Sequence, residues 1–163
     1  MTADQAKAIA EAIGQQIQQE WMTTVKVLEA IPEGRKDWKP ADKSRSAWEL
    51  ATHLAESDVW FLDGVIHQQF GAPGSSGAST VAQLVEWYKA QMPNRLERVL
   101  AMDGAKLAAI VDFFGMKMPN AQLLVFEAGH NAHHRGQLST YLRPMGSKVP
   151  NIFGGSADEP WQG

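Results

Sequence analysis

The chain repeats one pattern four times. Apolar residues recur three or four positions apart, in segments that end near a proline or a glycine. The first segment shows the pattern most clearly, with apolar residues at Ile9, Ile13, Ile17, Trp21, Val25 and Leu28. Because an α-helix turns by about 100° per residue, this spacing collects apolar side chains into a stripe along one face. Such a helix has to bury its stripe against similar helices. The pattern therefore predicts an all-α fold, an up-down four-helix bundle.

Capping residues set the expected starts of the second and third helices. Ser46 followed by Glu49 forms a capping box, which predicts a helix over about 46–66. Thr80 with Gln83 repeats this pattern after a loop rich in glycine and serine. These signals place two helices on either side of one flexible connection.

The second half of the chain contains one clear helix and one ambiguous stretch. Residues 103–118 fit a short strand, a turn or irregular chain, so we treat them as a connection. Pro119 suits the first turn of a fourth helix, which we expect to end near Pro144. We expect a single domain over 1–163, with a C-terminal tail over 146–163 that is ordered only where it docks.

Composition excludes several classes of function. The chain has 15 Lys and Arg against 18 Asp and Glu, a formal charge of −3, so it lacks the basic surplus that neutralises nucleic-acid phosphates. It contains no cysteine, so any thiol in its chemistry has to come with a substrate. It shows neither a signal-peptide pattern nor an apolar stretch approaching the roughly 18 residues of a membrane span. We expect a cytoplasmic protein without a nucleic-acid or membrane partner.

Three of the five histidines lie within five positions, and helix periodicity separates them. Relative to His130, a rotation of about 100° per residue places His134 near +40°, His133 near −60° and Arg135 near 140°. His130 and His134 therefore form an inward pair, His133 lies at the margin, and Arg135 faces the opposite side. The same predicted inward face holds Leu123, Phe126, Gln137 and Tyr141.

Two imidazoles one turn apart can chelate a divalent ion, although hydrogen bonds in a protein core could satisfy them equally well. His53, in the body of the second helix, could supply a third nitrogen and leave a tetrahedral metal with an open position. Gln137 could hydrogen-bond a ligand or a bound water. Imidazole suits zinc, nickel, iron and copper, so the residues alone do not select the metal.

A di-iron carboxylate site is the competing interpretation, because Glu127 and His130 form a Glu-x-x-His pair. Such sites need a second pair and two further glutamates. The second helix offers His53 and Glu56 in the reverse order, and the count of ligands fails. Glu127 could instead orient a histidine through a hydrogen bond.

Four stretches give the chain a resemblance to the DinB/YfiT-like family of small helical candidate metalloenzymes: SRSAWELATHL, DFFGMKMP, HNAHHRGQLSTYLRPMG and KVPNIFGGSADE. The resemblance implies an up-down bundle with an unusual connection between the second and third helices, commonly dimeric. It also implies a divalent metal held by His53, His130 and His134. We expect zinc or nickel, with iron as a third choice, and a homodimer.

Relatives in this family resemble transferases or isomerases that use low-molecular-weight thiols. The leading hypothesis is a metal-dependent S-transferase acting on small electrophiles, in which the metal lowers the pKa of a bound thiol. One alternative is a metal-dependent hydrolase with Glu127 or Glu56 as general base. Another is a non-catalytic metal-binding protein of the stress response.

Overall fold

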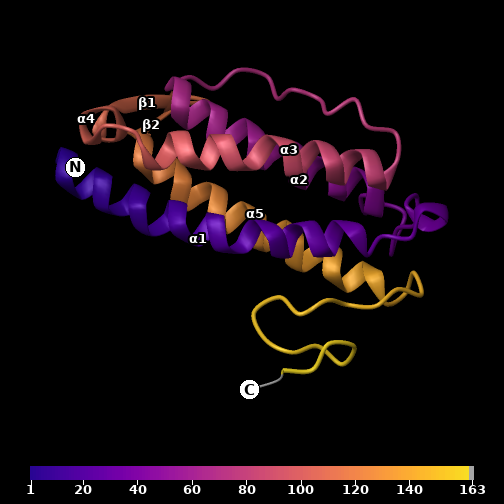
Figure 1. Cartoon of the computed structure of the whole chain (residues 1–163). Coiled ribbons are helices and arrows are strands. Elements are labelled where there is room, and N and C mark those ends of the chain that lie inside the picture. Colours follow the sequence, from indigo (N-terminus) through magenta and orange to yellow (C-terminus); the bar gives the residue numbers. More distant parts are fainter. Residues whose placement is uncertain (162–163) are drawn as a thin grey trace.

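Four long helices form the protein, shown in Figure 1 as a computed structural model that describes residues 1–161. They are α1 (Ala3–Glu29), α2 (Ala47–His67), α3 (Val81–Leu100) and α5 (Asn120–Leu142). A short 3-10 helix, η1 (Glu33–Arg35), follows α1. The predicted all-α, four-helix class is confirmed, and the apolar stripes of the helices meet in one continuous core.

The predicted caps determine where two of the helices begin. The Ser46 hydroxyl accepts from the Glu49 amide at 3.1 Å, and the Glu49 carboxylate accepts from the Ser46 amide at 2.7 Å. The Thr80 hydroxyl caps α3 by accepting from the Gln83 amide. Both bonds satisfy amides that the first helical turn leaves without partners. The sequence signals were therefore accurate to within one residue at these two starts.

The helices do not alternate strictly in direction. Lys7 of α1 donates to the Leu100 carbonyl at the end of α3, whereas Arg95 of α3 pairs with Asp63 of α2 near the ends of both helices. Thus α1 and α5 run one way, while the neighbouring α2 and α3 run the other way. Residues 68–80 connect α2 to α3 by returning along the length of the bundle (Figure 1). This is the unusual connection that the family resemblance implied. Because of it, the consecutive helices α2 and α3 run in the same direction, whereas consecutive helices of a simple up-down bundle run in opposite directions.

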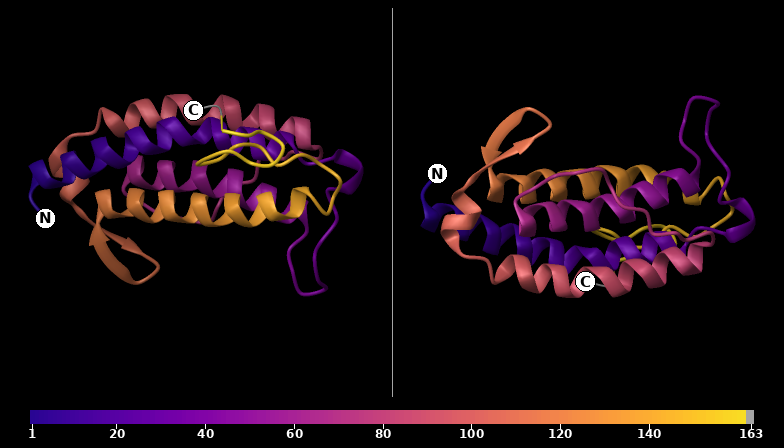
Figure 2. Two further views of the ribbon diagram at one scale, coloured as in Figure 1. Left: turned by 90° about the horizontal axis from the view of Figure 1, so that it is seen from below. Right: turned by 90° about the horizontal axis from the view of Figure 1, so that it is seen from above.

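The ambiguous stretch contains both a helical turn and a hairpin. The short helix α4 (Gly104–Ala108) precedes β1 (Ile110–Phe113), which pairs antiparallel with β2 (Met116–Pro119). Phe114 and Gly115 form the turn at positive φ, and the Asp112 carboxylate accepts from the Gly115 amide at 2.8 Å. Figure 2 shows this hairpin projecting from one end of the bundle.

The predicted orientation of α5 was wrong for three side chains. Gln137, which we placed inward, is exposed beside His134. Arg135, which we placed opposite the inward face, is only 1% exposed, and Phe126, which we placed inward, is 48% exposed. The face of α5 that enters the core carries Glu127, Asn131 and Arg135, and the histidines lie beside it, toward α2. Sequence reasoning assumes that charged residues are solvated, and a buried ion pair breaks that assumption.

The tail after α5 docks through polar contacts. Ser147 donates to the Ala30 carbonyl at 2.6 Å, and Asp158 accepts from the Val149 amide at 2.9 Å and from Arg143 at 2.7 Å. Residues 162–163 of the expected tail lie outside the described residues. Within the described chain, no helix is both long and apolar enough to span a membrane.

Candidate metal site

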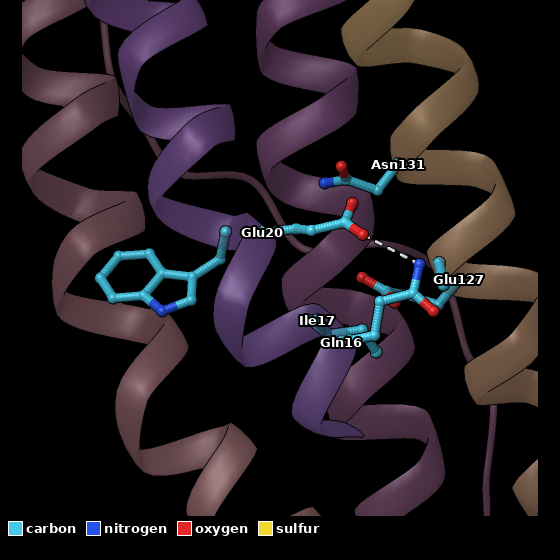
Figure 3. A pocket seen from close by; sticks show the side chains of 7 residues that line it. Gln16, Ile17, Glu20, Glu127 and Asn131 are labelled. Atoms are coloured by element: carbon cyan, nitrogen blue, oxygen red, sulfur yellow. Dashed lines mark hydrogen bonds between the residues drawn. The ribbon is translucent and has the colours of Figure 1, made fainter. Parts of the chain in front are cut away.

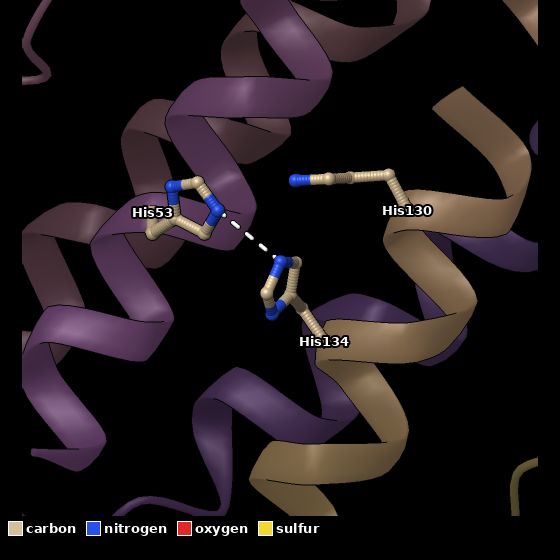
Figure 4. Close-up of side chains that lie close together, drawn as sticks. All are labelled: His53, His130 and His134. Atoms are coloured by element: carbon tan, nitrogen blue, oxygen red, sulfur yellow. Dashed lines mark hydrogen bonds between the residues drawn. The ribbon is translucent and has the colours of Figure 1, made fainter. Parts of the chain in front are cut away.

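Three histidines from two helices converge between α2 and α5 (Figure 4). His53 comes from α2, and His130 and His134 come from α5. One ring nitrogen of each lies within 4.8 Å of those of the other two, and the Nε2 atoms of His53 and His134 are 3.2 Å apart. Among the described residues, this is the only group of three or more His, Cys, Asp or Glu side chains close enough to hold one metal ion.

The helices set this geometry directly. His130 and His134 are four positions apart, which brings their ring centroids to 4.4 Å on one face of α5. The antiparallel α2 passes beside that face and places the His53 ring 5.0 Å from His130 and 4.6 Å from His134. All three residues are half-buried. The site is therefore anchored on rigid helices and still open to solvent.

Electrostatics keeps the three imidazoles neutral at physiological pH. Burial is the main cause that lowers the pKa of His53 to about 4, with help from the positive charge of Arg45. Burial, followed by repulsion from the neighbouring histidines, lowers the pKa of His130 to about 4 as well. The pKa of His134 is also lowered, again mainly by burial. Neutral rings keep a free lone pair, which is the form that binds a metal.

Hydrogen bonds at the outer ring nitrogens orient two of the rings. His134 Nδ1 donates to the Gln137 side-chain oxygen at 3.2 Å, which leaves the lone pair on Nε2, directed at His53. His53 Nδ1 lies 3.4 Å from the Ser57 hydroxyl. Without a metal, the His53 and His134 Nε2 atoms are placed to share a hydrogen bond (Figure 4), whereas a metal ion would take the lone pairs of both. His130 Nδ1 is the ring nitrogen of the three that is buried without a partner.

The other predicted site residues lie in three different environments. Gln137 contacts His134 as described above. His133 is exposed, with its ring 4.7 Å from that of His134. Glu127 is buried on the core face of α5, and no hydrogen bond joins either of its oxygens to a histidine or to any other described residue.

Two features beside the histidines were not predicted from the sequence: the aromatic side chains of Phe61 and Phe113, and the positively charged Arg45. The Phe61 ring lies 5.5 Å from both His130 and Phe126, and Phe113 of β1 lies 5.6 Å from Phe126. Arg45 lowers the pKa of all three histidines. Helix periodicity did place Phe126 on the same face as His130, one turn earlier, whereas the contacts of Phe61 and of the hairpin depend on the tertiary fold.

The core side of α5 carries a buried polar network. Arg135 pairs with Glu20 of α1 at 2.7 Å, and the Thr24 hydroxyl donates to the Asn131 side-chain oxygen at 3.1 Å. The Asn131 amide and the Tyr88 hydroxyl both donate to Asp58 of α2. These bonds fix α5 against α1 and α2, and thereby set the distance between His53 and the α5 pair.

The sequence pattern of the DinB family matches residues 5–161, which is nearly the whole chain. The chain belongs to the DinB family. Of the curated relatives, the uncharacterized protein YjoA of Bacillus subtilis (strain 168) is 28% identical over 127 residues, covering 76% of this chain and 82% of YjoA. The uncharacterized protein YrdA of the same organism is 45% identical over 51 residues, and this match spans only 30% of YrdA.

Solved DinB-like structures share the fold. The crystal structure of Bacillus subtilis YjoA has a TM-score of 0.70 at 23% identity and covers 86% of this chain and 96% of its own. A DinB-like protein from Bacillus cereus ATCC 10987 has a TM-score of 0.75 at 23% identity, covering 88% and 97%. At this identity the likeness establishes the DinB fold.

Proposed function

We propose that this DinB-family protein binds a divalent metal ion through His53, His130 and His134 and acts as a thiol-dependent S-transferase on small electrophiles. The observation that carries the proposal is the convergence of three half-buried, neutral imidazoles. Three protein ligands leave one position of a tetrahedral ion for water or substrate, as in catalytic rather than structural zinc sites. We place this activity in the cytoplasm, where low-molecular-weight thiols stay reduced.

The proposed ion is zinc or nickel, with iron as a third choice, in line with the family resemblance, and three imidazole ligands suit each of these ions. Two nitrogens bound to a tetrahedral zinc ion at 2.0–2.1 Å are separated by about 3.3 Å. The separation of 3.2 Å between Nε2 of His53 and Nε2 of His134 agrees with that value. The site could therefore accept such an ion with little movement of these two rings.

The residues around the three histidines have separate roles in the proposed transfer. A bound metal ion would lower the pKa of a substrate thiol so that the thiolate forms near neutral pH. Gln137 holds His134 in the tautomer that leaves Nε2 free. Phe61 and Phe126 provide an apolar wall beside His130 for the electrophile, and Arg45 contributes positive potential that favours an anionic thiol. The chain has no cysteine, so the nucleophile comes with the substrate.

Hydrolysis is the second candidate, and the surroundings of the two possible bases make it weaker. Glu56 accepts from the Ser76 amide and hydroxyl, both at 2.8 Å, which ties its carboxylate to the connection between α2 and α3. Glu127 lines a cavity next to α1. Within the described chain, neither carboxylate hydrogen-bonds a histidine. A general base has to reach the metal-bound water. Glu56 is near enough to raise the pKa of His53, but its carboxylate is held by Ser76.

Metal content tests the first half of the proposal. Protein purified without chelators should contain about one divalent ion per chain, and His53→Ala and His134→Ala should each remove it. His133→Ala is the matched control, since this exposed neighbour should leave the content unchanged. Metal-free wild-type protein, or equal metal loss in the control, would refute the assignment.

Turnover tests the second half. Consumption of monobromobimane or a chloronitrobenzene should be accelerated only when metal-loaded protein and an added low-molecular-weight thiol are both present, and His134→Ala should abolish the acceleration. Ester or amide cleavage without thiol would instead assign hydrolysis. A metal that raises the melting temperature without any turnover would assign a structural role.

A further inference from the structure

The connection between α2 and α3 covers a cavity. This cavity, of about 370 Å³, lies between the two helices and the connection. Its volume is within the range of about 300–1,000 Å³ that small-molecule sites occupy in proteins. The cavity between α1 and α5 shown in Figure 3 is far smaller, about 10 Å³, and has room for about one water molecule. The cavity under the connection is therefore the one of these two that can accommodate an organic ligand.

Two hydrogen-bonded anchors hold the connection over this cavity. The Trp60 indole N–H donates to the Gly71 carbonyl at 3.0 Å. One turn earlier on α2, the Glu56 carboxylate accepts from the Ser76 amide and hydroxyl, both at 2.8 Å. The segment between Gly71 and Ser76 spans the distance between these anchors and lines the cavity. A cover that is fixed at both ends keeps the cavity formed before a ligand arrives, which lowers the cost of binding.

The charged side chains of the lining leave one carboxylate without a cationic partner. Asp63 and Arg95 compensate each other, because the guanidinium donates to both Asp63 oxygens at 2.9 Å. Glu56 accepts only from neutral donors of Ser75 and Ser76, and all of these bonds go to its Oε1 atom. Within the described chain, its Oε2 atom accepts no hydrogen bond and its carboxylate forms no ion pair. The lining therefore presents one uncompensated negative charge and one free carboxylate oxygen.

Two indole rings line the same cavity, Trp60 from α2 and Trp87 from α3. Both residues are half-buried, and the Trp60 ring is also held by an edge contact with Phe70 at 5.2 Å. The face of an aromatic ring attracts a cation within about 6 Å of its centre, and indole does so most strongly. A carboxylate together with two indole rings therefore favours an alkylated ammonium group over a neutral or an anionic ligand.

The same lining does not suit an inorganic cation. Calcium takes about six to eight oxygen ligands, and magnesium needs a nearly octahedral set. Glu56 offers one free carboxylate oxygen, whereas both oxygens of Asp63 are taken by Arg95. His67, the other titratable side chain of the lining, is exposed, so solvent screens its effect. An organic cation needs fewer oxygen ligands, because its alkyl groups contact aromatic surface instead.

We propose that this cavity binds an organic cation, specifically an ammonium group that carries small alkyl substituents. The Glu56 carboxylate would compensate its charge, and its alkyl groups would lie against the rings of Trp60 and Trp87. The cavity lies beside the histidines along α2, but this ligand is bound without a metal. The proposal is therefore independent of the ion and of the reaction proposed above.

Calorimetric titration with choline chloride tests the proposal, because 3,3-dimethylbutan-1-ol has the same shape without the positive charge. The whole chain, stripped of metal, should bind choline saturably at one site and should bind the neutral alcohol about tenfold more weakly. His134→Ala should bind choline as tightly as the wild type, so failure of the proposed metal site would leave this result unchanged. Equal affinity for the two compounds, or no binding of choline, would overturn the proposal.

Two variants locate the binding site. Glu56→Gln removes the charge and keeps an oxygen for Ser76, and Trp87→Leu removes one indole ring, so each should weaken choline binding about tenfold. Glu86→Gln is the matched control, since this exposed carboxylate precedes Trp87 on α3 and lies outside the lining. Wild-type affinity in Glu56→Gln, or an equal loss in Glu86→Gln, would overturn the proposal. Melting curves check that each variant is folded, and Glu56→Gln decides the outcome if Trp87→Leu is not.

Discussion

At the scale of single residues, the histidine site combines partial burial with mutual repulsion. His53 and His130 both have pKa values lowered to about 4, mainly because burial disfavours the charged imidazolium. Repulsion adds to this effect, since a proton on one ring raises the energy of a proton on the next. The rings are therefore ready to bind a cation before any cation arrives.

This protonation behaviour predicts how metal binding depends on pH. Protons compete with the metal for the same lone pairs, so a lowered histidine pKa moves the competition to more acidic solution. Metal-loaded protein dialysed at pH 5 should keep its ion, and release should occur only as the pH falls through about 4. An ordinary imidazole, with a pKa of about 6.5, would already be mostly protonated at pH 5.

Metal content measured after dialysis across this range checks the prediction. His133→Ala should give the same profile, because that exposed ring contributes no ligand. Half-release near pH 6.5 would contradict the neutral, preorganised site.

At the scale of secondary-structure elements, α5 holds the protein together and presents the histidines. Its core face is fixed to α1 by the pair between Arg135 and Glu20, and to α2 by the bonds of Asn131 and Tyr88 to Asp58. Removing one member of a buried pair leaves the other charge without compensation.

Arg135→Ala should lower the free energy of unfolding by about 3–5 kcal/mol, because it removes the buried guanidinium that pairs with Glu20 and acts on the buried carboxyl groups of Asp58 and Glu127. Arg143→Ala is the matched control, since Arg143 pairs with Asp158 at the same distance of 2.7 Å on the exposed tail. That control should change stability very little. Denaturant unfolding of both variants measures the difference, and equal effects would contradict a special role for burial.

The elements also show what the sequence could and could not predict. Caps at Ser46 and Thr80 are local hydrogen bonds, so the starts of α2 and α3 could be predicted from neighbouring residues alone. Spacing also grouped His130 with His134, whereas His53 was a third candidate because of its place in the second helix and because of the family resemblance. The polar core face of α5 could not be predicted, because Arg135 is buried only through its partner Glu20, which lies 115 positions earlier.

The hairpin is a second feature that could not be predicted from neighbouring residues alone. The stretch IVDFFGMKM is apolar enough for a strand or for a buried plug, and its pairing depends on the positive φ angles of Phe114 and Gly115. Glycine tolerates that conformation, but phenylalanine rarely adopts it. Local propensity therefore could not select the turn.

At the scale of the whole molecule, the projecting hairpin exposes an apolar surface. Ile110, Phe114 and Met116 are all exposed there, and Phe114 reaches 70%. Large exposed apolar side chains gathered in one place mark interaction surfaces. We propose that this hairpin contributes to the homodimer expected from the family resemblance.

Phe114→Ser should weaken that dimer, because it removes a large exposed aromatic ring from the proposed contact. Phe153→Ser on the C-terminal tail is the matched control, since this ring is also 70% exposed. Analytical ultracentrifugation across a dilution series should show a wild-type dimer, an intact dimer in the control and dissociation of Phe114→Ser. A wild-type monomer at every concentration would refute the proposal.

The two faces of α5 have a consequence for how such a protein can evolve. His130 and His134 alternate along the helix with Asn131 and Arg135, so a one-residue insertion or deletion in this segment would rotate ligands and anchors out of place together. Under the proposed function, a new substrate preference is therefore more readily acquired on the hairpin, at Phe126 or around Arg45 than within the helix itself. A mutational library confined to those positions would vary the side chains around the histidines and leave the buried contacts of α5 unchanged.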